Sequence, residues 1–266
     1  MKKKIAFLLT AVLCLSAFAG CGSKKTDLEY IKDNGKMIMG ITLYEPMNYY
    51  DENGELTGFE TEFAKAVCEK LGVEAKFQVI DWKQKETELK SKAIDCIWNG
   101  LTVSEDRKEN MAFSTAYVSN RQVAIIRKAD AGKYTTAESM AGAKMIAESG
   151  SAGETAIQAD ATLSKNDYIA AAAQKDALLE IKAGTSDVAV LDYIMAKAVI
   201  RDDTDYSDLM IVEEIQLTPE EYAIGFRLED KELLAEVNKI IDELVEDGTL
   251  AGLAAKYDMS ENLAFK

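Results

Sequence analysis

The segment Ile94–Ser114, IDCIWNGLTVSEDRKENMAFS, carries the chain from a buried strand into a helix and predicts the fold. Its first five residues, 94–98, are typical of a largely buried strand, which Asn99-Gly100 then ends. Ser104, with two acidic residues after it, predicts the N-cap of a helix. A strand that leads through a short loop into a helix is the repeating unit of α/β folds, whose ligands lie beyond the carboxyl ends of strands.

Arg107 falls in the first turn of this predicted helix, where a cation opposes the positive end of the helix dipole. The unfavourable interaction costs about 0.3–1 kcal/mol, so either solvent screens the charge or an anion lies in front of it. Backbone N–H groups after Gly100, the Thr102 hydroxyl and a planar guanidinium suit a two-oxygen anion such as a carboxylate. The alternative is a surface arginine paired with Glu105 or Glu109.

Strand-like and helix-like segments alternate along the rest of the chain. This order predicts open, mainly parallel sheets that helices cover on both faces. The segments 99–102 and 148–152 and residue Asp192 each follow a predicted strand, so we expect them near a ligand. The expected strands are 37–43, 75–80, 94–100, 122–126, 143–147, 187–191, 209–215 and 222–226, and the expected helices are 59–71, 85–92, 154–160, 170–183, 233–245 and 250–257.

The first residues have the layout of a secretory signal peptide, at 1–20. Three lysines precede an apolar run that is shorter than the ~20 residues of a membrane-spanning helix, and no other segment carries a longer one. The sequence FAGC ending at Cys21 resembles the bacterial lipobox, although Phe18 stands where Leu is usual. We therefore expect Cys21 to carry the lipid and residues 21–26 to form a flexible, lipid-anchored tether. The alternative is simple secretion.

Composition excludes several function classes. The net charge of −15 argues against nucleic acid as a partner, and against membrane contact beyond the lipid anchor. The chain has no histidine, which excludes Ser-His-Asp and Cys-His catalysis and the commonest zinc sites, and it has no Gly-rich phosphate loop. We therefore expect neither a metal nor a cofactor. Cys68 and Cys96 lack metal-ligand spacing and are expected to be buried apolar residues, with a disulfide as the alternative.

Five segments, in order, resemble the solute-binding proteins of polar amino-acid ABC importers, over nearly the whole mature chain. The resemblance implies the type II periplasmic-binding-protein fold, with two doubly wound α/β lobes joined by two hinge crossings. Lobe 1 would comprise residues 27–118 plus 223–266, and lobe 2 residues 119–222. The segments are GFETEFAKAVCEKLG at 58–72, IDCIWNGLTVSEDRKENMAFSTAY at 94–117, ESGSAGE at 148–154, SDVAVLD at 186–192 and EYAIGF at 221–226.

The resemblance also implies a function. The protein would be a monomer, lipid-anchored to the outer face of the bacterial cytoplasmic membrane. It would bind a free amino acid between its lobes and deliver it to an ABC permease. Because Ile41 occupies a position that is acidic in the binders of basic amino acids, a neutral, polar or sulfur-containing ligand is favoured.

Nine positions acquire ligand-binding roles from the resemblance. Trp82 has the alternative of a core aromatic residue, and Asp192 that of a helix N-cap. At Ala152 a threonine is usual, which puts one hydroxyl contact in doubt. The implied contacts are Arg107, Thr102, Ser151 and Ala152 with the ligand carboxylate, Asp192 and the Gly100 carbonyl with its ammonium, and Tyr44, Trp82 and Asn99 with its side chain.

Two other functions of the same fold remain open. A cleft enzyme of the prephenate or arogenate dehydratase kind would need an acid or base, which without histidine would be a carboxylate such as Glu148 or Glu45. A ligand-sensing module would be expected to continue into a membrane span and a signalling domain, whereas this chain stops at Lys266.

Overall fold

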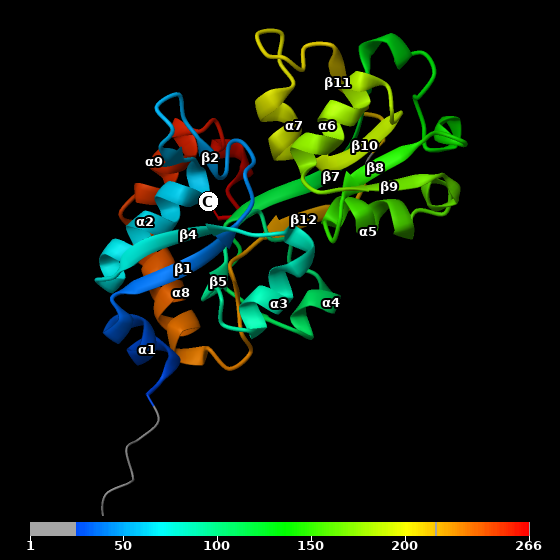
Figure 1. Cartoon of the computed structure of the whole chain (residues 1–266). Coiled ribbons are helices and arrows are strands. Elements are labelled where there is room, and N and C mark those ends of the chain that lie inside the picture. The colour runs from blue at the N-terminus through cyan, green and yellow to red at the C-terminus, as the bar shows by residue number, and fades with distance from the viewer. Residues whose placement is uncertain (1–24, 216, 266) are drawn as a thin grey trace, which may run out of the picture.

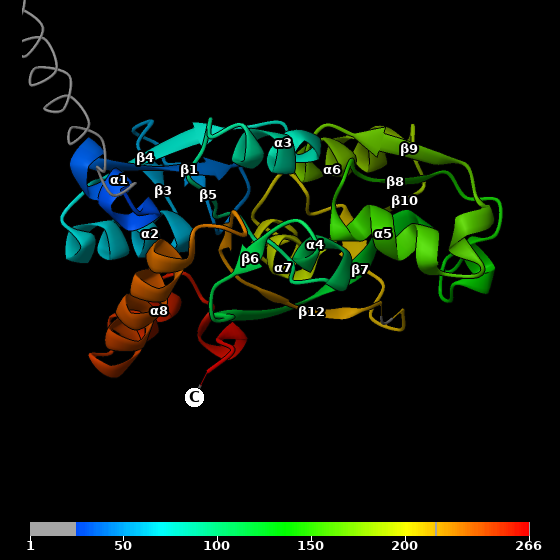
Figure 2. The ribbon, with the colours of Figure 1, turned by 90° about the horizontal axis from the view of Figure 1, so that it is seen from below.

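The computed structural model describes residues 25–215 and 217–265, which form two lobes side by side (Figure 1). The expected signal peptide and Cys21 lie outside these residues. Seen from below, the molecule is elongated, with one lobe at each end (Figure 2). Within the described ranges, no helix combines the length and the hydrophobicity needed to cross a membrane.

Lobe 1 is built on a five-stranded sheet in the order β4-β1-β5-β13-β6. β1 (Lys36–Ile41) pairs in parallel with β4 (Glu74–Val79) and with β5 (Cys96–Ile97), whereas β13 (Gly225–Phe226) is antiparallel to β5 and to β6 (Ala112–Phe113). A hairpin of β2 (Tyr49–Tyr50) and β3 (Leu56–Thr57) lies apart from this sheet. The helices are α1 (Asp27–Asn34), α2 (Phe59–Leu71), α3 (Lys85–Lys90), α4 (Glu105–Lys108), α8 (Lys231–Glu246) and α9 (Thr249–Lys256).

Lobe 2 is built on a second sheet in the order β11-β7-β10-β8-β9. Its strands are β7 (Val118–Arg127), β8 (Met145–Glu148), β9 (Tyr168–Ala171), β10 (Val188–Asp192) and β11 (Leu209–Ile211), and its helices are α5 (Ala152–Ala159), α6 (Gln174–Ala183) and α7 (Tyr193–Val199). β8 is parallel to both β9 and β10. Short 3₁₀ turns lie at η1 (Trp82–Gln84), η2 (Lys128–Asp130), η3 (Glu138–Met140), η4 (Leu163–Lys165) and η5 (Ser260–Asn262).

The chain passes between the two sheets along a pair of strands. β7 leads out of lobe 1, and β12 (Pro219–Tyr222) returns antiparallel to its first residues, with Tyr222 opposite Val118 and Pro219 opposite Arg121. Both strands run between the lobes in Figure 1. Val118 also forms a bridge with Leu263, so the end of the chain lies beside this crossing.

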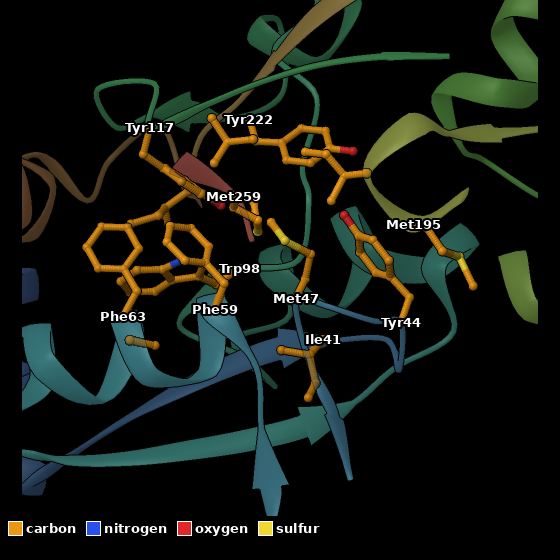
Figure 3. Packing of buried hydrophobic residues seen from close by; sticks show 14 of the residues in the cluster. Ile41, Tyr44, Met47, Phe59, Phe63, Trp98, Tyr117, Met195, Tyr222 and Met259 are labelled. Atoms are coloured by element: carbon orange, nitrogen blue, oxygen red, sulfur yellow. The ribbon is translucent and has the colours of Figure 1, made fainter. Parts of the chain in front are cut away.

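An aromatic cluster fills the core of lobe 1 beneath the crossing (Figure 3). Phe59 and Phe63 lie on one face of α2, as the i, i+4 spacing predicts. The Phe63 ring meets the edge of Trp98, with 5.0 Å between centroids, and lies 5.3 Å from Tyr117. Each of these side chains is at most 1% exposed, so the loop that begins at Asn99 starts from a fixed base.

The expected elements are found with several corrections. The predicted strand 222–226 is wrong, because Tyr222 ends β12 and a separate strand, β13, begins at Gly225. The predicted helix 170–183 is wrong at its start, because 168–171 is strand β9, parallel to β8, and α6 begins at Gln174. The predicted strand 94–100 pairs only at Cys96–Ile97. The sheets are mixed, since β7 and β13 are antiparallel to their neighbours. Cys68 and Cys96 are buried and free, which confirms the apolar interpretation over a disulfide.

Candidate functional site

A cavity between the lobes brings together all nine residues to which the family resemblance assigned ligand roles. From lobe 1 these are Tyr44, Trp82, Asn99, Gly100, Thr102 and Arg107, and from lobe 2 Ser151, Ala152 and Asp192. Thr42, Glu148 and Gln174 complete its wall. The loops after β5, β8 and β10 meet here, as the strand-end rule predicts.

The two lobes lie close together at this cavity. It has room for the centre of a water-sized sphere over only about 10 Å³, roughly what one water molecule needs. Lys85 Nζ of lobe 1 donates to the carbonyl oxygen of Gly150 in lobe 2 at 2.9 Å, and Arg107 Nη2 donates to the same oxygen at 3.2 Å. A ligand larger than water therefore requires the lobes to move apart.

Arg107 reaches the cavity from α4, whose first turn Ser104 caps by accepting from the Arg107 N–H. Its guanidinium donates to the carbonyls of Thr102, at 2.8 Å, and Gly150. No carboxylate lies within 4.0 Å of it in the described part of the chain, so the surface pairing with Glu105 or Glu109 does not form. Burial lowers the Arg107 pKa, which nearby acidic residues partly oppose.

Asp192 reaches the cavity from the end of β10, and three side-chain amides donate to its carboxylate. Oδ1 accepts from Asn120 at 2.9 Å and from Gln122 at 2.6 Å, and Oδ2 accepts from Gln174. Asp192 stands at the N-cap position of α7 but makes no side-chain cap hydrogen bond. Asn120 instead accepts from the Ile194 N–H, so the carboxylate faces the cavity rather than capping the helix.

Glu220 of β12 adds a second carboxylate beside Asp192. It accepts from the Thr102 hydroxyl at 2.9 Å and from Gln122 at 2.9 Å, so the hinge strand is tied to both lobes. Burial, and then the charge of Asp192, raise the Glu220 pKa to about 8. Because the Thr102 hydroxyl donates its hydrogen bond to Glu220, this hydroxyl would have to rotate before it could donate to a ligand carboxylate.

Gly100 is fixed by a buried carboxylate behind the cavity. Its N–H donates to both oxygens of Glu60, at 2.8 and 3.0 Å. Its φ of 51° suits glycine, and a Cβ would lie 2.2 Å from the Tyr44 hydroxyl. Asn99 holds the neighbouring loop, accepting from the Thr42 N–H at 2.9 Å and donating to its carbonyl.

The two aromatic candidates both line the cavity and pack into cores. Trp82 is 5% exposed, and Tyr44 is 4% exposed. Lys85 Nζ lies 4.9 Å from the centroid of the Trp82 ring, and burial, with the Arg107 charge, lowers the Lys85 pKa to about 8. The core alternative for Trp82 and its position at the cavity are therefore both correct.

Sequence reasoning missed several residues at the site. Gln174 was placed inside a longer predicted helix, and nothing in the local pattern marked Thr42. Glu220 comes near the cavity only through the pairing of β12 with β7, which joins residues about 100 positions apart. Glu148 begins the segment 148–152 that was expected near a ligand, but the only role given to its side chain was that of a possible enzyme acid. No group of three or more metal-binding side chains occurs in the ranges that the structure describes.

Comparison with known proteins agrees with this geometry. The family model for bacterial extracellular solute-binding proteins, family 3, matches residues 37–260. The chain belongs to this family. Among curated family-3 relatives, the L-cystine-binding protein TcyJ of Escherichia coli K12 is 28% identical over 254 residues, covering 95% of this chain and 92% of that protein. The arginine-binding extracellular protein ArtP of Bacillus subtilis is 29% identical over 263 residues, covering 97% and 99%.

The fold of this family-3 chain also matches solved structures. The P235GK mutant of ArgBP from T. maritima superposes with a TM-score of 0.81 and 30% identity, covering 87% of this chain and 99% of that one. The expected type II periplasmic-binding-protein fold is therefore confirmed.

Proposed function

We propose that the protein is an extracytoplasmic receptor that binds one free amino acid between its lobes and delivers it to an ABC import permease. One observation carries the proposal: a cation from lobe 1 and a carboxylate from lobe 2 line one cavity, each held by neutral groups. The Arg107 guanidinium donates to two backbone carbonyls, and three side-chain amides donate to the Asp192 carboxylate. Relatives named for cystine and arginine support an amino-acid ligand.

The binding mode follows from these two charges. The ligand carboxylate lies against Arg107, with Ser151 and the first N–H groups of α5 on its other side. The α-ammonium lies against Asp192 and the Gly100 carbonyl. Because the two charges come from different lobes, only the closed arrangement satisfies both ends of the zwitterion, so ligand favours closure. Tyr44, Trp82 and Asn99 remain for the side chain.

A thermal-shift screen of the mature protein over the twenty amino acids and cystine tests this proposal. We expect at least one amino acid to raise the melting temperature, because a ligand that binds only the folded state stabilises it. Calorimetry then gives the affinity. If no amino acid shifts the melting temperature or releases heat, the receptor proposal fails.

The enzyme alternative is tested with the same protein. A receptor needs only complementary contacts, and the curated relatives reported above are binding proteins. We therefore expect no product when the protein is incubated with prephenate or arogenate. Turnover that depends on Glu148 would instead identify a cleft enzyme.

Attachment to the outer face of the membrane is part of the proposal. The Cys21 thiol is the point of lipid attachment that the FAGC sequence offers. Changing Cys21→Ser should release the protein or leave it uncleaved, whereas Cys68→Ser should leave attachment unchanged. Membrane fractionation that shows no difference between wild type and Cys21→Ser would refute the lipid anchor.

A further inference from the structure

Glu148 is a buried acidic residue of the cavity, and neither the α-carboxylate nor the α-ammonium of the proposed ligand is assigned to it. It ends β8, is 3% exposed and lines the cavity together with Ser151 and Gln174. Its Oε1 is fully buried and has no hydrogen-bond partner in the described part of the chain. Because an unpaired buried carboxylate is costly, such a group is expected to have a partner that arrives with the ligand.

The cations already in the cleft do not supply that partner. Lys85 Nζ is bound by the carbonyls of Gly150 and Trp82, and Arg107 by those of Thr102 and Gly150. Neither forms an ion pair with Glu148 within 4.0 Å in the described ranges. Burial, and then the Asp192 charge, raise the Glu148 pKa to about 8, and Lys85 only partly opposes this.

The acidic character of the cleft gives the sign of the missing group. Arg107 and Lys85 are its cations, and Asp192, Glu220 and Glu148 are its acidic side chains, of which burial and the Asp192 charge raise the pKa of the two glutamates to about 8. An amino acid with a neutral side chain brings no cation to Glu148, whereas a cationic side chain favours the ionised form of this carboxyl and supplies its missing partner. The Trp82 ring lines the same cavity, and its face attracts cations.

We infer that Glu148 is a specificity-determining residue that selects amino acids with a cationic side chain. This inference rests on the proposed function and adds the class of ligand. It differs from the expectation drawn from Ile41, which favoured a neutral ligand. Ile41 is fully buried in the lobe 1 core and does not line the cavity, so its apolar character leaves the choice of side chain open.

Two pairs of ligands test the inference by calorimetry on wild-type protein. Citrulline replaces the guanidinium of arginine with a neutral urea of nearly the same shape, and norleucine replaces the lysine ammonium with a hydrogen atom. We expect arginine and lysine to bind at least about 30-fold more tightly than their neutral partners, the effect of one buried charge pair. Equal affinities within either pair, or tighter binding of cystine than of both cationic amino acids, would overturn the inference.

The Glu148→Gln variant assigns the preference to this residue. In this variant the affinities for arginine and citrulline should differ by no more than about threefold, mainly because arginine binds more weakly. Glu138→Gln, which makes the same change at an exposed residue of the same lobe outside the cavity, is the matched control and should keep the full preference. If Glu148→Gln keeps that preference, the inference fails while the receptor function stands. If no amino acid binds wild type, the receptor function fails as well.

Discussion

Two buried arginines of lobe 1 differ in the groups that surround their guanidinium charges. Arg227, just after β13, is 6% exposed and forms an ion pair of 2.8 Å with Asp230, with Asp95 at 3.9 Å. Arg107, at the cleft, has no carboxylate within 4.0 Å in the described ranges and is held by carbonyl oxygens. The first charge is neutralised within the fold, whereas the second is held in place and left for an outside partner.

The comparison separates charges that stabilise from charges that bind. Breaking a buried ion pair leaves an unpaired charge in the core, and the cost falls on folding. Removing a charge that is held only by neutral dipoles changes the stability of the free protein little. The loss appears instead in the free energy of ligand binding. The two arginines therefore predict different responses to the same substitution.

The largest effect is expected for Arg227→Ala, on stability. It leaves Asp230 and Asp95 without their cation, so the free energy of unfolding should fall by about 3–5 kcal/mol, measured by urea denaturation. Arg201→Ala, which removes an exposed arginine paired with Asp203, is the control and should change it by less than about 0.5 kcal/mol. Loss of ligand affinity in folded Arg227→Ala, with stability unchanged, would break the distinction.

Arg107→Ala should act on binding instead. It leaves a desolvated ligand carboxylate unpaired, which costs about 2–5 kcal/mol of binding free energy by calorimetry. The melting temperature without ligand should stay close to that of wild type. Arg107→Lys should recover only part of the affinity, because an ammonium cannot reproduce the two-pronged guanidinium. Wild-type affinity in Arg107→Ala would exclude the carboxylate role.

Asp192→Asn extends the comparison to lobe 2. The amide keeps the size of the side chain and removes its charge, so binding should weaken by roughly 2–4 kcal/mol, or about 30- to 1000-fold. Closure should weaken too, because a ligand shifts the equilibrium only by its differential affinity for the closed state. Solution scattering should show contraction of wild type at a ligand concentration that leaves the variant open. Contraction of both at the same concentration would mean that the ammonium is held elsewhere.

Glu60 gives a further test of the difference between charges that affect stability and charges that bind ligand. Its carboxyl group is held by neutral donors, as Asp192 is, but it does not line the cavity. Gly100, Asn48 and Tyr117 donate to it, and burial raises its pKa from 4.5 to about 7. Between these two values the folded protein keeps a proton that the unfolded chain has released. The Glu60 contribution to stability should therefore fall as pH rises from 4.5 to 7, by at most about 3 kcal/mol.

The measurement is the difference in unfolding free energy between wild type and Glu60→Gln, taken at several pH values across this window. The difference cancels the titration of groups that both proteins share. A difference that does not change with pH would show that the three donors fully compensate for burial.

Local pattern predicted those parts of the molecule that depend on neighbours in the sequence. Ser104 as a cap and the buried face of α2 both follow from spacing within a few residues. Strand β9 could not be predicted in this way, because the alanine-rich sequence from Ala170 has helical propensity and only pairing with β8 makes it extended.

The same limit applies to the site. Arg107 was identifiable because a cation in the first turn of a helix is locally unfavourable. The strand pattern placed Asp192 and Ser151 near a ligand, and the family resemblance supplied their contacts and added Trp82. Glu220 carries no local signal, since its place depends on how β12 returns beside β7.

The antiparallel pairing of β7 with β12 also bears on how fast a ligand can leave. Residues 118–121 of one strand are hydrogen-bonded to 219–222 of the other, so the two connections bend together as one ribbon. Neither can flex alone without breaking that ladder. Opening is then a single concerted event, and a bound molecule escapes only as often as the ribbon bends. We expect release to follow one exponential, whose rate is that of this concerted opening.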